Sequence, residues 1–456
     1  MHLKRNLTLL SLSLILIACF IRLGYYTNRA DTLEVFSLFG AAFLCYYFLI
    51  KQSLSLKKII FGGIALRLVL IAMLPNLSDD YYRFIWDGLL LNNGINPFEH
   101  VPSYYINQSS LPIGITKELF IKLNSPDYYT IYPPVCQLSF WIASFFISSN
   151  LLPSVIVMRI FILFSEVGIL IVFPKILSRL NLNPENIKWY AFNPLVIVEL
   201  TGNLHYESLM ICFLGISLFL LIRKQIVLAA VIFSFSVASK LLPLMFLPLL
   251  FFVLEWKKAI KFYIVTGVMI LLLFVPFLNQ EMIMNMGSSV NLYFQKFEFN
   301  ASIYYVIRWI GYQVKGYNII QTAGVRLSYI VVAIILLMSI SKPFDYKNLF
   351  TKMLFALSIY FFTATIIHPW YICSLVAISV FTQFKFSYLW SALAIVSYST
   401  YNNAEYQENL LLTTLEYALV YGLLIYELNK NNYFEQLKVF VEHQYRNIVN
   451  KKGILK

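Results

Sequence analysis

Long, uninterrupted apolar segments are the feature that most restricts how this chain folds. A helix needs about 20 mostly apolar residues to cross the hydrocarbon core of a bilayer. Segments of roughly this length and of low charge are residues 7–26, 33–50, 58–74, 205–222, 260–278, 323–340, 349–367 and 411–427. Shorter or interrupted apolar segments are 132–149, 152–176, 187–200, 226–239, 241–254, 370–384 and 386–400. Continuous runs of this kind predict helices rather than the alternating strands of a membrane barrel.

Composition supports the same conclusion. Of the 456 residues, 59% are hydrophobic and 12% are charged, whereas soluble domains carry about 25% charged residues. Mean hydropathy is +0.71. Such a chain cannot cover a water-facing surface, which excludes the soluble, disordered, collagenous and disulfide-rich classes. We therefore expect an all-α polytopic membrane protein with about 13 to 15 transmembrane helices.

The basic residues set the expected topology. The chain has 35 Lys and Arg against 22 Asp and Glu, and most basic residues lie in short segments between apolar runs. Such segments face the cytoplasm, so no nucleic-acid partner is expected. Residues 1–429 would form one membrane domain, followed by a basic cytoplasmic tail, 430–456. The polar stretches 75–129 and 279–316 would lie outside, the first with short interfacial helices. The topology of 132–188 stays open, because two apolar segments lie where the charges require an odd number of crossings.

Ionisable side chains beside the apolar segments converge on the expected outer face. At the centre of a membrane helix such a residue costs about 2.5–3.5 kcal/mol, so its presence needs a reason. The side chains concerned are Asp79, Asp80, His205, Glu207, Lys240 and His368. Their gathering on one face favours a polar site over a purely structural scaffold.

The acidic pair opens a motif that runs from Ser78 to Gly88. With Ser78 as N-cap, both aspartates fall in the first helical turn, where the helix dipole favours negative charge. One interpretation is a capped interfacial helix with aromatic anchors. The other is general-base chemistry by one carboxylate, with a lipid phosphate near Arg83. Gly94 and a following proline predict the end of this helix.

Later motifs allow similar pairs of interpretations. Tyr132 precedes two prolines that favour the start of a helix. An Asn-Pro step at 193–194 breaks an apolar run, and helix breaks at membrane depth often line a cavity. His205 either binds a backbone carbonyl or forms a cavity wall with Glu207. Lys240 and His368 either anchor at the interface or line the cavity, where Lys240 would serve a phosphate. Arg159 and Glu166, seven residues apart, are expected to pair inside the bundle.

Taken in order, these motifs resemble the GT-C class of membrane glycosyltransferases. The resemblance rests on the segment from Ser78 to Gly88, on Gly94-Ile95-Asn96-Pro97-Phe98 and Tyr132-Pro133-Pro134, and on the later motifs at 193–207, 240–243 and 368–371. Within the class, the pattern is most similar to bacterial polyprenyl-phosphomannose-dependent mannosyltransferases. It is more distantly similar to the catalytic subunit of the first mannosyltransferase of GPI-anchor synthesis.

This resemblance implies a GT-C-like bundle in a bacterial inner membrane with an extracytoplasmic active site. It implies inverting transfer of a sugar, mannose by analogy, from a polyprenyl-phosphate donor to a glycan or glycolipid hydroxyl. Asp79, with Asp80 as second candidate, would be the base. The residues expected to bind the donor phosphate or lipid are Arg83, Lys240, His368 and Tyr132. Those expected to line the acceptor side or cavity are His205, Glu207, Trp86, Asp87 and Tyr371.

Two alternatives stay open. The relative of the GPI pathway has an Asp-x-Asp where this chain has adjacent aspartates, so the involvement of a divalent metal is not decided. A transporter or flippase for a lipid-linked sugar would also contain broken helices, although we find no matching sequence halves of the kind that such proteins show.

Overall fold

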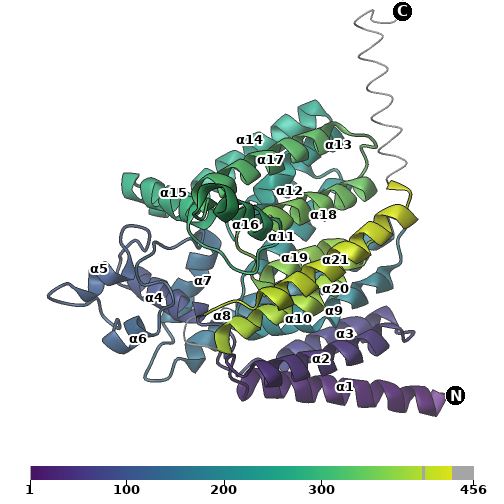
Figure 1. Cartoon of the computed structure of the whole chain (residues 1–456), viewed down its shortest axis with the longest axis horizontal. Coiled ribbons are helices and arrows are strands. Elements are labelled where there is room, and N and C mark those ends of the chain that lie inside the picture. The colour runs from purple at the N-terminus through teal and green to yellow at the C-terminus, as the bar shows by residue number, and fades with distance from the viewer. Residues whose placement is uncertain (1, 403–405, 434–456) are drawn as a thin grey trace, which may run out of the picture.

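The structure, a computed structural model, describes residues 2–402 and 406–433. In this part of the chain the regular secondary structure consists of helices joined by turns and loops (Figure 1). The β-pairing among the described residues is an isolated parallel bridge between Phe299 and Ile366. The expected all-α membrane fold is therefore confirmed. Residues 434–456, which hold most of the expected basic tail, lie outside the described part.

The helices fall into three groups by length and position. The bundle consists of α1 (His2–Tyr25), α2 (Thr32–Ile50), α3 (Leu56–Leu68), α8 (Leu152–Arg179), α11 (Glu207–Ile222), α12 (Ile226–Val237), α13 (Leu247–Leu254), α14 (Trp256–Phe274), α17 (Ile320–Ile340), α18 (Tyr346–Thr363), α19 (Ile372–Ser379), α20 (Phe386–Leu393) and α21 (Leu410–Lys430). The polar loops carry α4 (Asp80–Asn92), α5 (Pro102–Ile106), α6 (Lys117–Ile121), α7 (Pro134–Ser144), α15 (Gln280–Gln295) and α16 (Ile303–Lys315). Short connecting elements are η1 (Pro184–Ile187), α9 (Lys188–Ala191), α10 (Pro194–Val196), the π-helix η2 (Ile197–Gly202), η3 (Leu242–Phe246), η4 (Val275–Phe277), η5 (Pro369–Tyr371) and η6 (Ala394–Asn402).

The number of single helices that are long and apolar enough to cross a membrane is smaller than the 13 to 15 transmembrane helices expected from the sequence. Among the described residues, six are long and apolar enough, namely α1, α2, α8, α14 with η4, α17 and α21, and a bent pair around α11 raises the total to seven. Prolines and polar residues divide the other apolar segments into shorter helices. The segment 132–149 forms only the 11-residue α7, about 16 Å long and too short to cross. The 28-residue α8 is then the crossing between the first polar loop and Lys175.

The polar loop helices gather at one end of the bundle. Helices α4, α5 and α6 lie at the opposite end from the N-terminus and from the last turn of α21 (Figure 1). Large apolar side chains on the spans, such as Phe164 and Leu271, are exposed on the outside of the bundle. A surface of this kind suits contact with lipid chains.

The first polar loop packs around its own apolar core. Side chains of α4, among them Phe84 and Trp86, pack against α7 and the start of α8. Gly88 of α4 allows the close approach, because a Cβ atom there would lie 2.3 Å from the carbonyl oxygen of Phe140. Helix α4 ends at Asn92 as expected, and Gly94 follows with φ +70°.

Replacing Gly88 by alanine should force α4 and α7 apart. We expect the free energy of unfolding to fall by about 1–3 kcal/mol, the usual cost of overpacking a close contact. Gly422→Ala is the matched control, since nothing lies within 4 Å of a Cβ atom at that position of α21. Thermal unfolding in detergent measures both variants, and equal melting temperatures would contradict this account of the α4–α7 contact.

The expected break at Asn193-Pro194 is present and leads into a sharp turn. Asn193 caps α10 by accepting a hydrogen bond from the Val196 amide at 3.2 Å. The segment 194–202 then meets α11 at an angle of 110°. Leu204 in this turn has φ +63°, a conformation that costs energy for a side chain of this size. The break therefore places His205 and Glu207 at the start of α11.

The expected pairing of Arg159 with Glu166 is wrong. Arg159 instead donates to the carbonyl groups of Thr201 and Gly202 at the end of the broken helix, and to that of Ile71 in the turn after α3, at 2.7–2.9 Å. Glu166 forms a fully buried ion pair with Arg67 at 2.7 Å. The sequence spacing correctly indicated buried charges but not the partners supplied by other helices.

Candidate active site

The acidic pair lies at the start of α4. Asp79, rather than Ser78, is the N-cap residue, because the helix begins one position later than expected. The Asp79 carboxylate forms an ion pair with Arg29, which lies in the turn between α1 and α2. Asp80 accepts hydrogen bonds from Asn124 Nδ2 at 2.7 Å and from the Tyr132 hydroxyl at 3.4 Å. The two carboxylates therefore have different environments, one charged and one neutral.

The phenol of Tyr81 follows directly on this helix. Burial raises the pKa of Tyr81 well above its ordinary value, and the neighbouring Tyr82 and Asp79 act in the same direction. Tyr81 is therefore a neutral group at physiological pH, and the carboxylates are the bases available at the start of α4.

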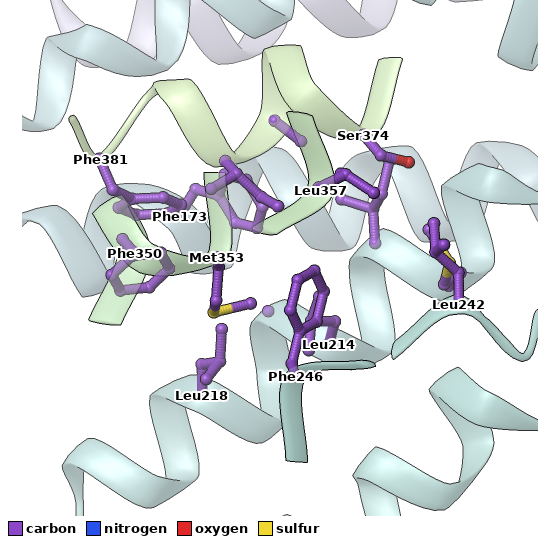
Figure 2. A pocket seen from close by; sticks show the side chains of 15 residues that line it. Phe173, Leu214, Leu218, Leu242, Phe246, Phe350, Met353, Leu357, Ser374 and Phe381 are labelled. Atoms are coloured by element: carbon purple, nitrogen blue, oxygen red, sulfur yellow. The ribbon is translucent and has the colours of Figure 1, made fainter. Parts of the chain in front are cut away.

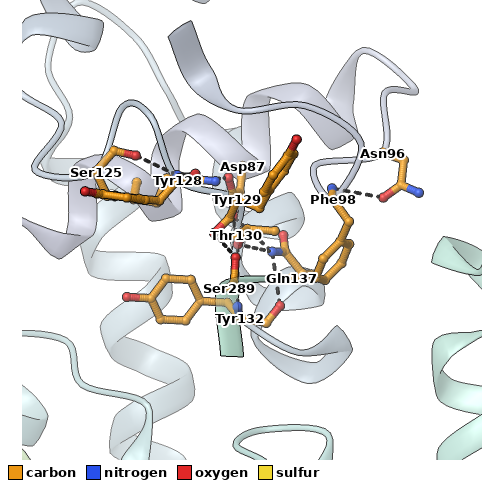
Figure 3. A network of polar contacts seen from close by, with 11 residues as sticks. Asp87, Asn96, Phe98, Ser125, Tyr128, Tyr129, Thr130, Tyr132, Gln137 and Ser289 are labelled. Carbon is orange, nitrogen blue, oxygen red and sulfur yellow. Dashed lines mark hydrogen bonds and ion pairs between the residues drawn. The ribbon is translucent and has the colours of Figure 1, made fainter. Parts of the chain in front are cut away.

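Arg83 and Asp87 belong to a buried network under the first loop (Figure 3). Arg83 donates to Asp87 at 2.8 Å and to the carbonyl groups of Ser125 and Tyr128 at 3.1 and 2.8 Å. Asp87 also accepts from Thr130 at 2.5 Å and from the Gln137 amide at 3.0 Å. The structure thus places both residues where they hold the segment 125–130 in position.

Trp86 lies in the apolar core of the same loop. Its side chain is fully buried and packs near the rings of Tyr105 and Phe120, with centroids 6.5 and 6.1 Å away. This position gives Trp86 a role in holding the loop together.

Two histidines from distant segments stack on one tryptophan. The ring of His205 lies 3.8 Å from that of Trp370, and the ring of His368 lies 4.3 Å from it, both nearly parallel. Phe299 of the second polar loop contacts His368 at 4.8 Å. A short bridge fixes this contact, because Phe299 N donates to Thr365 O and Ile367 N donates to Phe299 O, at 3.0 and 2.8 Å. The broken helix, the second loop and the segment before α19 therefore meet here.

A buried carboxylate that the sequence analysis did not single out lies behind the stack. Glu199, in the π-helix η2, accepts hydrogen bonds from the Tyr398 hydroxyl and from Asn203 Nδ2. Its Oε2 atom lies 3.3 Å from His205 Nε2. π-Helical turns are frequent at functional sites, and this one places the Glu199 carboxylate beside His205.

Lys240 and Glu207 form an ion pair at the start of α11. The ammonium group also lies 4.9 Å from the centre of the Tyr371 ring. Glu207 is buried, whereas about a third of the Lys240 side chain is exposed. The lysine is therefore held at the site by a carboxylate and an aromatic face, and it keeps one exposed side.

Contacts through Arg29 join the acidic pair to the histidine stack. The guanidinium of Arg29 lies 4.7 Å from the centre of the Tyr401 ring. Tyr401 in turn contacts Phe299 at 6.3 Å and Tyr398 at 5.9 Å. On the other side, the ring of Tyr371 lies 5.5 Å from that of His368 and 4.9 Å from the ammonium of Lys240. Groups from seven separate parts of the chain thus surround one region.

A narrow apolar pocket lies beneath this region (Figure 2). Met210 lies one helical turn after Glu207, Leu242 lies two residues after Lys240, and Ser374 lies one turn after Tyr371; all three line the pocket. Ser374 and Leu242 appear on the same side of the view, opposite Phe350 and Phe381. The pocket is therefore lined by residues that follow Glu207, Lys240 and Tyr371 in the chain.

The residues expected at the site fall into two sets in the structure. One set consists of Asp79, Asp80, Tyr132, His205, Glu207, Lys240, His368 and Tyr371, which surround the region described. The other set consists of Arg83, Trp86 and Asp87, which are buried beneath the first loop. Within residues 2–402 and 406–433, no group of three or more His, Cys, Asp or Glu side chains is arranged to hold a metal ion.

Comparison with known proteins gives two matches. The family model of the alpha-(1->6)-mannopyranosyltransferase N-terminal domain matches residues 15–257, more than half of the chain. The chain is also 23% identical over 178 residues to alpha-(1->6)-mannopyranosyltransferase A of Corynebacterium glutamicum. This second match covers 38% of the chain and 34% of the relative, so the chain aligns with about a third of the length of that curated protein.

The region matched by the family model contains the acidic pair, the broken helix and Lys240, whereas His368 lies beyond it. The chain belongs to the alpha-(1->6)-mannopyranosyltransferase family, which confirms the expected relationship to bacterial mannosyltransferases of GT-C type.

Proposed function

We propose that the protein transfers mannose from a polyprenyl-phosphate donor to a hydroxyl group of a glycan or glycolipid on the extracytoplasmic side of a bacterial inner membrane. By analogy with the family, the new bond would be an α-(1→6) linkage. The observation that carries this proposal is the chain of contacts that joins the acidic pair to His368 through Arg29, Tyr401 and Phe299. Tyr371 contacts both His368 and the ammonium of Lys240. A base, the cations Lys240 and Arg29 for a phosphate, and an apolar pocket for a lipid are the parts that this reaction needs.

Asp80 is the better placed of the two candidate bases. Its partners are an amide and a phenol, so its carboxylate keeps lone pairs available for the hydroxyl proton of an acceptor. Asp79 is occupied by Arg29. In this assignment, Asp79 holds the arginine in place beside the reacting groups. The family resemblance favoured Asp79 as the general base, and the contacts in the structure favour Asp80.

Lys240, His368 and Arg29 serve the leaving phosphate. Phosphate favours lysine as a point charge and arginine as a fork of donors. The Nδ1 atom of His368 is buried without a hydrogen-bond partner among the described residues, so it has capacity for a ligand. Glu207 holds Lys240, and Glu199 lies beside His205, which stacks on the same tryptophan as His368.

The proposed step balances without a further reactant. The acceptor oxygen attacks the anomeric carbon from the face opposite the phosphate, the bond from this carbon to the phosphate oxygen breaks, and Asp80 takes the hydroxyl proton. The configuration at the anomeric carbon is inverted. Polyprenyl phosphate leaves with its charge opposed by the cations, and the isoprenoid next to the phosphate packs along the apolar pocket.

The test is transfer by the purified protein in liposomes. We expect polyprenyl-phosphomannose to support formation of an α-mannoside, and nucleotide-activated mannose to support none. Mass analysis detects the product and proton NMR gives its anomeric configuration. Movement of labelled donor across the bilayer with no new glycosidic bond would instead identify a flippase.

A further inference from the structure

A polar cleft lies between the first polar loop and α15, outside the region assigned to the donor. One wall is the segment 127–129 with Tyr128 and Tyr129, and the other includes Ser288 and Asn291 of α15, with Lys296 just after it. The cleft has a volume of about 350 Å³ and is partly open to solvent. Small-molecule sites have volumes of roughly 300–1,000 Å³, so the cleft is large enough for a ligand.

The lining of the cleft is suited to a saccharide. Two phenol rings, hydroxyl groups, an amide, the carboxylate of Asp127 and the ammonium of Lys296 line it, with no aliphatic side chain among them. Saccharides pack their C–H faces on aromatic rings and exchange hydrogen bonds with amides, hydroxyls and charged groups. A lipid chain would pack best on Leu, Ile or Val side chains, and none of these lines the cleft.

The tyrosine wall is held in place from behind (Figure 3). Arg83 donates to the carbonyl group of Tyr128 at 2.8 Å, and Arg83 is itself held by Asp87. The hydroxyl group of Ser289 donates to Tyr129 O at 3.4 Å and so joins the two walls. The buried Arg83 network therefore serves to fix the backbone of this wall. A fixed wall loses little conformational entropy when a ligand binds.

The residues on both sides of the segment 127–129 connect the cleft with the proposed base. Asn124, before this segment, donates to Asp80, and the hydroxyl group of Tyr132, after it, also donates to Asp80. Tyr132 lies three positions after Tyr129, which limits the distance between their Cα atoms to about 11 Å. A saccharide in the cleft therefore lies close enough to present a neighbouring sugar to Asp80.

We infer that this cleft binds the non-reacting sugars of an oligosaccharide acceptor. The inference rests on the proposed function and deepens it, because it assigns the acceptor a binding surface distinct from the donor region. Selectivity for a longer acceptor over a shorter one then comes from α15 and the segment 127–129.

The test compares two acceptor probes, an α-(1→6)-linked mannotetraose and methyl α-mannoside. We expect Tyr128→Ala to raise KM for the tetrasaccharide about tenfold, the size of one lost aromatic contact. The KM for the donor, and kcat/KM with methyl α-mannoside, should not change. Ser288→Trp, which fills the cleft from its other wall, should have the same effect. Tyr312→Ala is the matched control, since this exposed tyrosine of α16 is not part of the cleft.

Direct binding separates this inference from the proposed function. Isothermal titration of the donor-free protein with mannotetraose should show binding that Ser288→Trp weakens about tenfold. Binding without transfer by the wild-type protein would refute the proposed function and keep the cleft assignment. Transfer by the wild-type protein with unchanged tetrasaccharide KM in both cleft variants would overturn the cleft assignment alone.

Discussion

Replacing Asp80 by asparagine is expected to lower turnover by about 10²–10⁴-fold, the usual contribution of a general base. Asparagine has nearly the same shape and still accepts a hydrogen bond from Asn124, so the fold should be unchanged. It cannot take a proton from the acceptor hydroxyl. Initial rates in liposomes with polyprenyl-phosphomannose measure the effect, and the melting temperature verifies the fold.

Asp79→Asn is the comparison that assigns the base. This change removes the partner of Arg29 in a partly exposed ion pair, an interaction worth about 0–1 kcal/mol. We expect turnover to fall about fivefold or less. A larger loss in Asp79→Asn than in Asp80→Asn would reverse the assignment, and wild-type turnover in both would refute catalysis by this acidic pair.

Replacing Arg67 by methionine is expected to lower the free energy of unfolding by about 3–5 kcal/mol, as is usual when one partner of a buried ion pair is lost. Both side chains of the Arg67–Glu166 pair are fully buried. Arg67 also donates to the carbonyl groups of Gly63 and Ala191, at 2.9 and 2.8 Å, so the change strands several polar groups. Yield in detergent and thermal unfolding measure the loss.

Two further variants test whether the loss of stability in Arg67→Met comes from the unpaired buried charge of Glu166. Arg67→Met with Glu166→Leu should recover part of the stability, because it removes both charges together. Arg22→Met is the exposed control, since Arg22 pairs with Glu34 at the surface and should lose about 1 kcal/mol or less. Equal losses in Arg22→Met and Arg67→Met would show that burial of the pair does not determine its contribution.

Apolar run length predicted the membrane class correctly but did not show which apolar runs form one long helix and which divide into shorter helices. The helix after Pro133 and the break at Asn193-Pro194 appear where proline chemistry places them. Hydropathy alone did not show that the segment 132–149 ends as a helix at Ser144 or that 241–254 divides into η3 and α13. Those limits depend on packing against neighbouring helices, which a single sequence does not display.

Residues of the candidate site were predictable from the sequence where an ionisable side chain interrupts an apolar segment. His205, Glu207, Lys240 and His368 were found for this reason, and Glu199 carried the same signal as a lone carboxylate inside such a run. Arg29 carried none, because an arginine in a short polar turn is ordinary in sequence. Its relevance appears only when folding brings the turn between α1 and α2 to Asp79 and Tyr401.

The two hydrogen bonds between Phe299 and the segment 365–367 have a consequence for how the two proposed substrate sites affect each other. They fasten the second polar loop to the residues just before His368, while the same loop supplies Lys296 and α15 to the cleft. If a saccharide in the cleft drew α15 inward, these backbone bonds would carry the displacement to the segment before His368. The two proposed sites would then be coupled, and by linkage each substrate would change the affinity for its co-substrate by the same factor.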